Sequence, residues 1–424
     1  MAESPQVRPP GAGLSGPLAG IRVVELGQIL AGPLATAILG WLGAEVIKVE
    51  EPAHGDPLRT WRVVEDGTSL WWRGVARGKQ LVAIDLRRPE GQDLVRRLVL
   101  GADVLVENFR PGTLEGWGLD PDALRRERPE LVVARISGYG QTGPYRDRRG
   151  FASVCEAFGG LRHITGEPGR VPVRSNASVG DSLAAFQTVI GVLASLVRRG
   201  RHPEQRGDVV DVAIYEAVLG VLEGALTECD RAGVVREPSG TTITGVVPTD
   251  AYPTADGRRI VVGANADPVF RRLMRVAGRE DLADDPRLAD NAGRVAHQRE
   301  VDDAIAAWTS TLPADDVIAR LVQAGVPASA IHTASDLLSD PHVRSRGVVE
   351  AVDLGGKPLA LPVLGPFLTE APGRTTWPGG ELGQHTDDVL RTHLGLDRET
   401  LDQLHASGVV AGPRGSAEGE STPA

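Results

Sequence analysis

The sequence predicts an α/β protein, with a Rossmann-like large domain built around a mainly parallel sheet and a smaller α+β domain. Three observations lead to this prediction. Short runs rich in β-branched residues alternate with helical patterns through residues 21–137. The pattern changes at a long apolar helix that follows Asp181, and a separate series of strands and helices begins near Arg258. Strands that alternate with helices form βαβ units, whose strands run parallel.

The first expected strands and helices follow one another closely. Residues 21–26 (IRVVEL) form the first strand and residues 31–42 the helix after it. Pro33 is tolerated because it falls in the first turn of that helix. The remaining strands expected in this part are 45–50 (EVIKVE), 81–86 (LVAIDL), 103–107 (DVLVE) and 131–137 (LVVARIS), with an amphipathic helix at 91–100.

The second half of the chain begins with a long apolar helix, expected at 183–197. A strand at 209–212 (VVDV) and a helix from Tyr215 follow it. The smaller domain then opens with a strand at 258–264 (RRIVVGA). Its helices are expected near 268–276, 299–311 and 313–324, and residues 348–361 form a pair of strands that returns to the large domain.

These patterns divide the chain into tails, two domains and a linker. Residues 1–16 and 411–424 are rich in Pro, Gly, Ser and Ala. We expect them to be disordered, because they cannot bury enough apolar surface to offset the entropy lost on ordering. The large domain is expected at 17–200 and again at 345–408, the linker at 201–224 and the small domain at 225–340.

Composition excludes several classes of protein. The net charge of -10 argues against a nucleic-acid binder, which needs a basic face. The longest uncharged run, residues 26–44, is interrupted by Pro33, Gly40 and Gly43. We therefore expect a buried turn and helix there, and not a membrane span. Because the first residues lack the pattern of a secretory signal, we expect a soluble, cytoplasmic protein.

Generic cofactor and metal motifs are not found in the sequence. Residues 74–80 (GVARGKQ) lack the spacing of a phosphate loop, and Gln80 stands where a magnesium-binding hydroxyl would be. The βαβ pattern has no dinucleotide fingerprint. The nine His are scattered, and Cys155 and Cys229 lie in unrelated contexts. We therefore expect no metal site and no disulfide.

What distinguishes the sequence is a series of short strings in a fixed order. They are LAGP at 30–33, GAEVIKVE at 43–50, GDPLR at 55–59, ENFRPG at 107–112, SGYGQTGP at 137–144, GDS at 180–182 and DVAIYEA at 211–217. One such string would be weak, but the combination is specific. From about Leu18 to about Leu396 the chain resembles the family III CoA-transferases, the CaiB/BaiF family.

The resemblance implies an enzyme that moves CoA between carboxylic acids and folds as an interlocked homodimer. Its substrates would be acyl-CoA and small acids, with no tightly bound cofactor. The family's nucleophile falls on Asp181, which would form an acyl anhydride and then an aspartyl-CoA thioester. A free Asp titrates near roughly 3.9, so it is an anion at neutral pH and needs no adjacent base. Without the resemblance, Asp181 would more simply be the N-terminal cap of its helix.

The resemblance also places residues around CoA. Asn108 and Phe109 would lie against CoA, and Leu30 and Ala31 would approach the thioester, with the Ala31 N–H as the expected oxyanion donor. For the phosphates, we expect contacts from basic side chains near strand ends and helix starts. These side chains are Arg59, Lys79 and Arg110, each of which could instead be a solvated surface charge.

The acceptor is expected to be a dicarboxylic acid and the donor succinyl-CoA. The strings at 159–168 (GGLRHITGEP) and 248–257 (PTDAYPTADG) are similar to those of family members that use succinyl-CoA with dicarboxylates. An arginine would bind the unreacted carboxylate as a fork. Arg162 and Arg174 are the candidates, with His163 a weaker one, and the loop at 239–245 would close over the site.

Two other functions stay open. A 2-methylacyl-CoA racemase of the same superfamily would need a His-Asp element, whose positions here hold Phe151 and Ala152. Neither side chain exchanges a proton, which argues against racemisation. A CoA-binding homologue without catalytic activity is disfavoured because Asp181 is retained.

Overall fold

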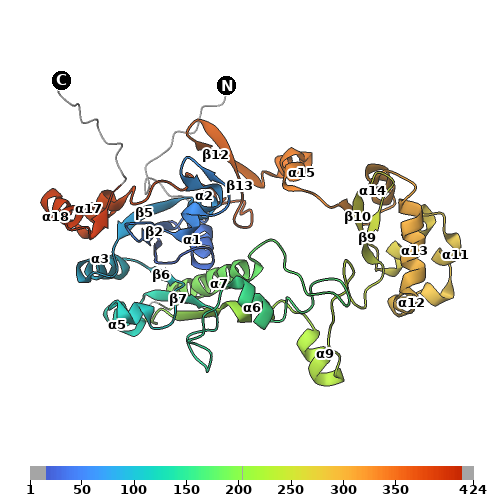
Figure 1. Cartoon of the computed structure of the whole chain (residues 1–424), viewed down its shortest axis with the longest axis horizontal. Helices are drawn as coiled ribbons and strands as arrows, with labels where there is room; N and C mark the ends of the chain where they lie inside the picture. The colour runs from blue at the N-terminus through green and yellow to red at the C-terminus, as the bar shows by residue number, and fades with distance from the viewer. Residues whose placement is uncertain (1–15, 203, 413–424) are drawn as a thin grey trace. The chain divides into compact units, whose positions relative to one another are not determined.

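A computed structural model describes residues 16–202 and 204–412 (Figure 1). The chain forms two compact units. Of the described residues, the first holds 16–160, then Ser175–Leu222, then 347–412. The second holds Leu161–Arg174 and Glu223–Arg346. Of the expected tails at 1–16 and 411–424, all but residues 16, 411 and 412 lie outside the described residues.

The first unit is built on a seven-stranded sheet of order β14-β5-β2-β1-β6-β7-β8. All of its pairs are parallel except β14 with β5. This confirms the expected α/β class with a mainly parallel sheet. The strands are β1 (Arg22–Glu25), β2 (Glu45–Glu50), β5 (Lys79–Ile84), β6 (Val104–Glu107), β7 (Val132–Ser137), β8 (Val209–Ala213) and β14 (Val410–Ala411).

The strand order reverses between β1 and β6. From β1 the chain moves through β2 to β5 toward one edge, and from β6 through β7 and β8 toward the other. Val24 of β1 pairs with Ile47 on one side and Leu105 on the other. Loops that leave the carboxyl ends of two strands at such a reversal diverge and open a crevice. Residues 27–30 and 108–112 are those loops.

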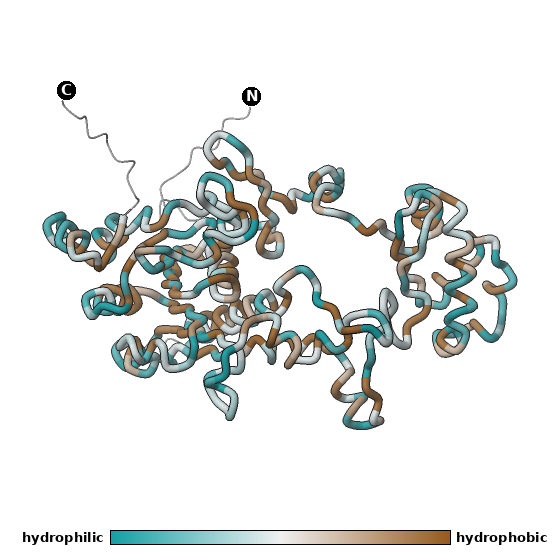
Figure 2. The backbone as a smooth tube through the Cα atoms, viewed as in Figure 1, coloured by the Kyte–Doolittle hydropathy of each residue, from teal (hydrophilic) through white to brown (hydrophobic). Residues whose placement is uncertain are grey.

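Helices cover both faces of the sheet, which explains why its strands are continuously apolar. Alternate residues of a strand face opposite sides, so Val23 and Val46 pack in one cluster with α1 (Ala31–Trp41) and α7 (Val179–Arg201). Val24 and Ile47 pack in the other cluster. In Figure 2 hydrophobic colour gathers along these strands. The helices of the second cluster are α3 (Pro89–Leu100), α5 (Pro121–Glu127), α17 (Thr386–Leu394) and α18 (Arg398–Ala406).

The expected buried turn and helix within residues 26–44 is confirmed, because α1 buries nearly all its residues. Among the described residues, α7 is the one helix long and apolar enough to cross a bilayer by length and composition. Its buried face packs in the core of the first unit. Buried core helices of globular proteins can have the same length and apolar composition as a membrane-spanning helix. The cytoplasmic location stays a prediction.

Three segments differ from the expected divisions of the chain. Residues 201–224, expected as a linker, contain β8 of the large sheet and α8 (Ile214–Leu219). Residues 161–174 group with the second unit. At the C-terminal end, Ala411 pairs with Ala83 and so belongs to the sheet, although the tail was expected to begin there.

The second unit is α+β, as expected. Its three strands form an antiparallel sheet of order β11-β10-β9, from β9 (Thr249–Pro253), β10 (Arg259–Gly263) and β11 (Ala328–Ala330). Helices α10 (Asp267–Val276), α13 (Gln298–Thr309) and α14 (Ala314–Gln323) pack on it around Phe270, Ile305 and Leu321. After this unit the chain forms the hairpin β12 (Val349–Leu354) and β13 (Lys357–Pro362), a separate two-stranded sheet.

Candidate active site

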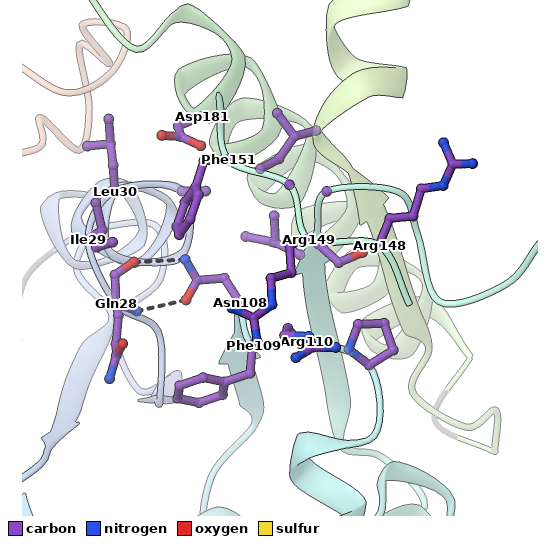
Figure 3. A pocket seen from close by; sticks show the side chains of 17 residues that line it. Gln28, Ile29, Leu30, Asn108, Phe109, Arg110, Arg148, Arg149, Phe151 and Asp181 are labelled. Carbon is purple, nitrogen blue, oxygen red and sulfur yellow. Dashed lines mark hydrogen bonds between the residues drawn. The ribbon is translucent and has the colours of Figure 1, made fainter. Parts of the chain in front are cut away.

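The two loops at the strand-order reversal are joined by one side chain. The Asn108 Oδ1 accepts the backbone N–H of Gln28 at 2.7 Å, and its Nδ2 donates to the Gln28 carbonyl at 2.8 Å (Figure 3). Asn108 therefore fixes the turn after β1 with both ends of its amide. Beside it, the Phe109 N–H donates to Glu107, and the Phe109 ring packs edge-on against Trp117.

The turn after β1 holds an unusual backbone conformation. Ile29 has a φ of 64°, in the left-handed region that β-branched residues avoid. Its N–H donates to both carboxylate oxygens of Asp56, each at 3.1 Å. The next residue, Leu30, is the N-cap of α1. The N–H of Ala31 is therefore in the first turn of α1, where N–H groups lack a partner within the helix.

A buried ion network lies behind this turn. The Lys48 Nζ lies 2.8 Å from Glu25 Oε1 and 3.0 Å from Asp56 Oδ2. The Lys79 Nζ lies 2.7 Å from Glu25 Oε2. Burial alone raises the pKa of Glu25, but the two lysines outweigh it and lower that pKa to about 2. Burial, together with Lys48, lowers the pKa of Lys79 to about 8.

Asp181 enters the site from α7. The helix N-cap is Ser178, so Asp181 lies in the first turn and is not the cap that the simpler interpretation assumed. An anion in the first turn interacts favourably with the helix dipole. The preceding residue is Gly180, whose N–H donates to the buried Glu156 at 3.0 Å. A Cβ there would come within 3.1 Å of Ile214, so glycine permits the close packing of α7 and α8.

Cys155 lies in the same neighbourhood on α6 (Ala152–Phe158). Its thiol is buried and lies 3.4 Å from the Gly138 carbonyl. Burial, with the negative charges of Asp181 and Glu156, raises the pKa of Cys155 to about 12. The thiol therefore stays protonated at neutral pH.

These loops and helices enclose one pocket of about 380 Å³. In Figure 3, Asp181 and Phe151 lie at one end beside the turn after β1, and Phe109 and Arg110 lie at the other. The pocket is lined by Gln28, Ile29, Leu30, Ala31, Asn108, Phe109, Arg110, Pro111, Ile136, Ser137, Gly138, Arg148, Arg149, Gly150, Phe151, Asp181 and Ile214.

The pocket combines one carboxylate with three arginines. Arg110, Arg148 and Arg149 are exposed, and the Arg148 guanidinium stacks at 3.4 Å over the Tyr145 ring. Exposed arginines are suited to phosphate groups. The arrangement thus places a carboxylate, backbone N–H groups and positive charge around one cavity.

Comparison with known proteins identifies this combination. Residues 18–386 match CoA-transferase family III. The chain is 47% identical over 398 residues to the succinyl-CoA–D-citramalate CoA-transferase of Chloroflexus aurantiacus, covering 93% of this chain and 98% of that protein.

The chain belongs to CoA-transferase family III.

Further relatives agree with the assignment. The chain is 37% identical to the succinate–glutarate CoA-transferase of Agrobacterium fabrum, over 88% of this chain and 95% of that one. The crystal structure of a CaiB/BaiF family protein from Brucella suis superposes with a TM-score of 0.79 at 32% identity, covering 89% of this chain and all of that one. The protein is therefore a transferase whose substrates are CoA thioesters.

Two residues expected to contact CoA phosphates are buried in ion pairs with other side chains of the transferase. Lys79 is fully buried, and its ammonium donates to Glu25 and to the Pro33 carbonyl. Arg59 is also buried, paired with Glu50 through two hydrogen bonds and stacked 3.6 Å from Trp72. The burial and the ion pairs argue against the phosphate-binding role expected for both residues. Their charged groups lie among other protein groups, where a phosphate could not reach them without breaking buried ion pairs.

The expected acceptor residues lie in the second unit. Arg162, His163 and Arg174 fall within Leu161–Arg174 and are not among the residues that line the pocket. The His163 Nε2 lies 3.6 Å from Glu237. Their role stays a prediction, and so does closure of the loop at 239–245.

Sequence reasoning missed Gln28, Arg148 and Arg149. The arginines follow the string at 137–144 along the chain, and a search for basic residues after strand ends would have found them. It placed Phe151 at the position of a racemase His, and the structure puts that ring beside Asp181 in the pocket. Ala152 is buried. Neither side chain is a proton-transfer group, which argues against the racemase.

Proposed function

We propose that this enzyme transfers CoA from succinyl-CoA to a dicarboxylic acid, with Asp181 as the covalent nucleophile. The observation that carries the proposal is the presence of the Asp181 carboxylate in one pocket with the first turn of α1. The relatives named above act on succinyl-CoA with citramalate, and on succinate with glutarate. These names support a dicarboxylate acceptor.

The proposed reaction exchanges activated acyl groups without ATP. A carboxylate oxygen of Asp181 attacks the thioester carbonyl, and the C–S bond breaks to give an acyl anhydride and CoA thiolate. The thiolate attacks the aspartyl carbonyl, which releases the donor acid and leaves an aspartyl-CoA thioester. The acceptor carboxylate attacks that thioester, giving a new anhydride and the thiolate. Attack of the thiolate on the acceptor carbonyl forms the product thioester and regenerates the Asp181 carboxylate.

Each tetrahedral intermediate places a negative charge on the former carbonyl oxygen. The Ala31 N–H lies at the positive end of α1 and is the proposed donor to that oxygen, because a fixed N–H stabilises charge that develops only in the transition state. Asn108 and Phe109 form the wall against CoA. Arg110, Arg148 and Arg149 supply the positive charge for its phosphates.

The acceptor's second carboxylate requires a cation as well. Arg162 and Arg174 remain the proposed ligands, with His163 a weaker one. A forked arginine–carboxylate contact would fix the acceptor so that its other carboxylate reaches the aspartyl-CoA thioester.

We also propose that the working enzyme is a homodimer of the family's interlocked type. On α7 the side chains of Phe186, Ile190 and Val197 form an apolar stripe exposed by 49%, 66% and 54%. Such a stripe on a helix is suited to packing against another helix. Three helices, α9 (Ala225–Ala232), α15 (Ala334–Ser339) and α16 (Pro341–Arg346), bury no residue within the chain. A second copy would give these elements a packing partner.

Replacing Asp181 with Asn tests the nucleophile. Asp181→Asn should lower turnover by roughly 10⁴-fold or more, because an amide cannot form the anhydride. The control is Asp120→Asn at the N-cap of α5, where the carboxylate accepts the Ala123 N–H at 2.7 Å. If Asp181 only stabilises a helix start, both variants will lose a little stability and keep turnover, and the proposal fails.

A panel of acids tests the acceptor. We expect transfer from succinyl-CoA to C4–C6 dicarboxylates, and little transfer to monocarboxylates of equal length, because these lack the group that an arginine binds. Turnover is measured by the disappearance of the donor thioester. Equal rates with both kinds of acid would overturn the dicarboxylate assignment and leave the reaction class standing.

A further inference from the structure

We propose that Asp56, held by the buried ion network, is a positioning residue that sets the direction of the Ala31 N–H during catalysis. The inference rests on the proposed function, because it concerns the donor to the thioester oxygen. Asp56 does not line the pocket. It acts on the reaction only through the turn formed by residues 28–31.

Ile29 holds a strained backbone conformation. Of the four described non-glycine residues with positive φ, Ile29 is the β-branched one. Such a residue leaves the left-handed region unless its surroundings hold it there. The two contacts to Asp56 hold the Ile29 N–H, and Asn108 holds both backbone groups of Gln28. Two side chains thus hold the peptide group that precedes the strained residue, two residues before Ala31.

Asp56 is itself held by several contacts. Its carboxylate also accepts the Leu58 N–H at 2.9 Å and lies 3.0 Å from Lys48. Its backbone N–H donates to Glu50, which is paired with Arg59. Asp56 therefore has little freedom, and the turn that it holds shares that rigidity.

The buried ion network contacts the backbone on both sides of the turn formed by residues 28–31. The Lys48 ammonium donates to the Gly27 carbonyl and the Lys79 ammonium to the Pro33 carbonyl, at 2.8 and 2.7 Å. Glu25 links the two lysines and also accepts from Thr36 of α1. The network thus contacts the chain before and after the turn, from the end of β1 into the first turns of α1.

A buried ion network is poor evidence for stability, because desolvation offsets most of the attraction. Its geometry here indicates another use. The two lysines and two carboxylates balance in charge, and their hydrogen bonds end on the backbone of residues 27–33. A donor fixed in advance stabilises the transition state without reorganisation. Loss of Asp56 should therefore lower kcat and leave the KM for the acyl-CoA nearly unchanged.

The first test is Asp56→Asn, which keeps an oxygen acceptor for the Ile29 N–H and removes the charge that faces Lys48. We expect kcat to fall by about 10- to 100-fold, with KM within about twofold of the wild type. The matched control is Asp103→Asn. That carboxylate also accepts a backbone N–H, from Arg22 at 2.9 Å, and pairs with Arg199, away from the pocket. Equal kcat in Asp56→Asn and wild type, whatever the melting temperature, overturns the inference.

A second pair of variants keeps the inference testable if Asp56→Asn does not fold. Ile29→Gly and Ile29→Ala both remove the side chain, but only glycine frees the backbone at positive φ. We expect Ile29→Gly to have the lower kcat by at least about fivefold, since its turn is no longer confined. Equal kcat values for the two would contradict a positioning role. Where Asp56→Asn folds, adding it to Ile29→Gly should lower kcat little further, because both act through one turn.

Failure of this inference is distinguishable from failure of the proposed function. If Asp181→Asn abolishes turnover and the Asp56 and Ile29 variants keep wild-type kcat, the nucleophile stands and the positioning role falls. If Asp181→Asn keeps turnover, the proposed function falls, and with it the reason to assign the turn an oxyanion.

Discussion

At the scale of single residues, the site depends on charged groups that never meet solvent. Glu25 is fully buried and holds two lysines, and the lysines hold the backbone around the turn after β1. The cost of burying these charges is offset only while every partner is ionised and in place. Residues outside the pocket are therefore bonded to the backbone that forms one of its walls.

Acid should destabilise the protein through Glu25. Its pKa is lowered to about 2 in the folded protein, against 4.5 for an ordinary Glu. Below 4.5 the unfolded chain binds a proton that the folded protein does not. The contribution of Glu25 to the free energy of unfolding is thus fully present above about pH 5 and is lost as the pH falls toward 2. Its full size is about 3 kcal/mol. Urea unfolding at pH 7, 5 and 4 measures the loss.

The comparison is Glu25→Gln, which has no charge to titrate. We expect its free energy of unfolding at pH 7 to be lower by about 3–5 kcal/mol, because two buried lysines lose their shared partner. It should also change less between pH 5 and 4 than the wild type does. If the free energy of unfolding changes equally with pH in Glu25→Gln and the wild type, Glu25 is not the group responsible for the loss of stability in acid.

At the scale of elements, the position of Asp181 depends on how closely α7 packs on the sheet. Gly191 of α7 faces Val210 of β8, and a Cβ there would lie 2.4 Å from a Val210 methyl. A contact this short forces the helix or the strand to move. Glycine in this helix interior is therefore a packing requirement, although glycine is a poor helix former.

Two glycines of the same helix give a direct test of this packing. Gly191→Ala should lower the free energy of unfolding by about 1–3 kcal/mol, because overpacking exceeds the gain in helix propensity. Gly200→Ala, where no atom lies within 4 Å of the new Cβ, should raise it by up to about 1 kcal/mol. Thermal melts and urea titrations compare the two. A stabilised Gly191→Ala would mean that α7 can move away from β8 freely.

At the scale of the whole molecule, the exposed stripe on α7 bears on assembly. Ile190→Glu places a charge at its centre, and a charge buried in an apolar interface is costly. We expect the variant to be monomeric in analytical ultracentrifugation and to have a lower melting temperature than the wild type. Arg398→Gln makes the same change in net charge at an exposed side chain. It should not alter the mass of the assembly in solution. An Ile190→Glu protein with the mass of the wild type would exclude this stripe from the interface.

The amino-acid sequence was enough to predict the class of fold and the family, and it made Asp181 the candidate nucleophile. Strands buried on both faces are continuous β-branched runs, and their alternation with helices is local information. The motif strings then point to Asp181, which the structure places in the pocket with Ala31 and Asn108.

The three-dimensional structure was needed to show which charged side chains line the pocket. Lys79 and Glu25 are 54 residues apart, and Lys79 is buried because β5 and β1 flank the same neighbour, β2, in the sheet. Its place near a strand end predicted a phosphate ligand, whereas strand pairing turns it toward a carboxylate. Arg148 and Arg149 carried no motif and yet line the pocket. The direction of a charged side chain follows from strand order and packing over long separations, which no local pattern records.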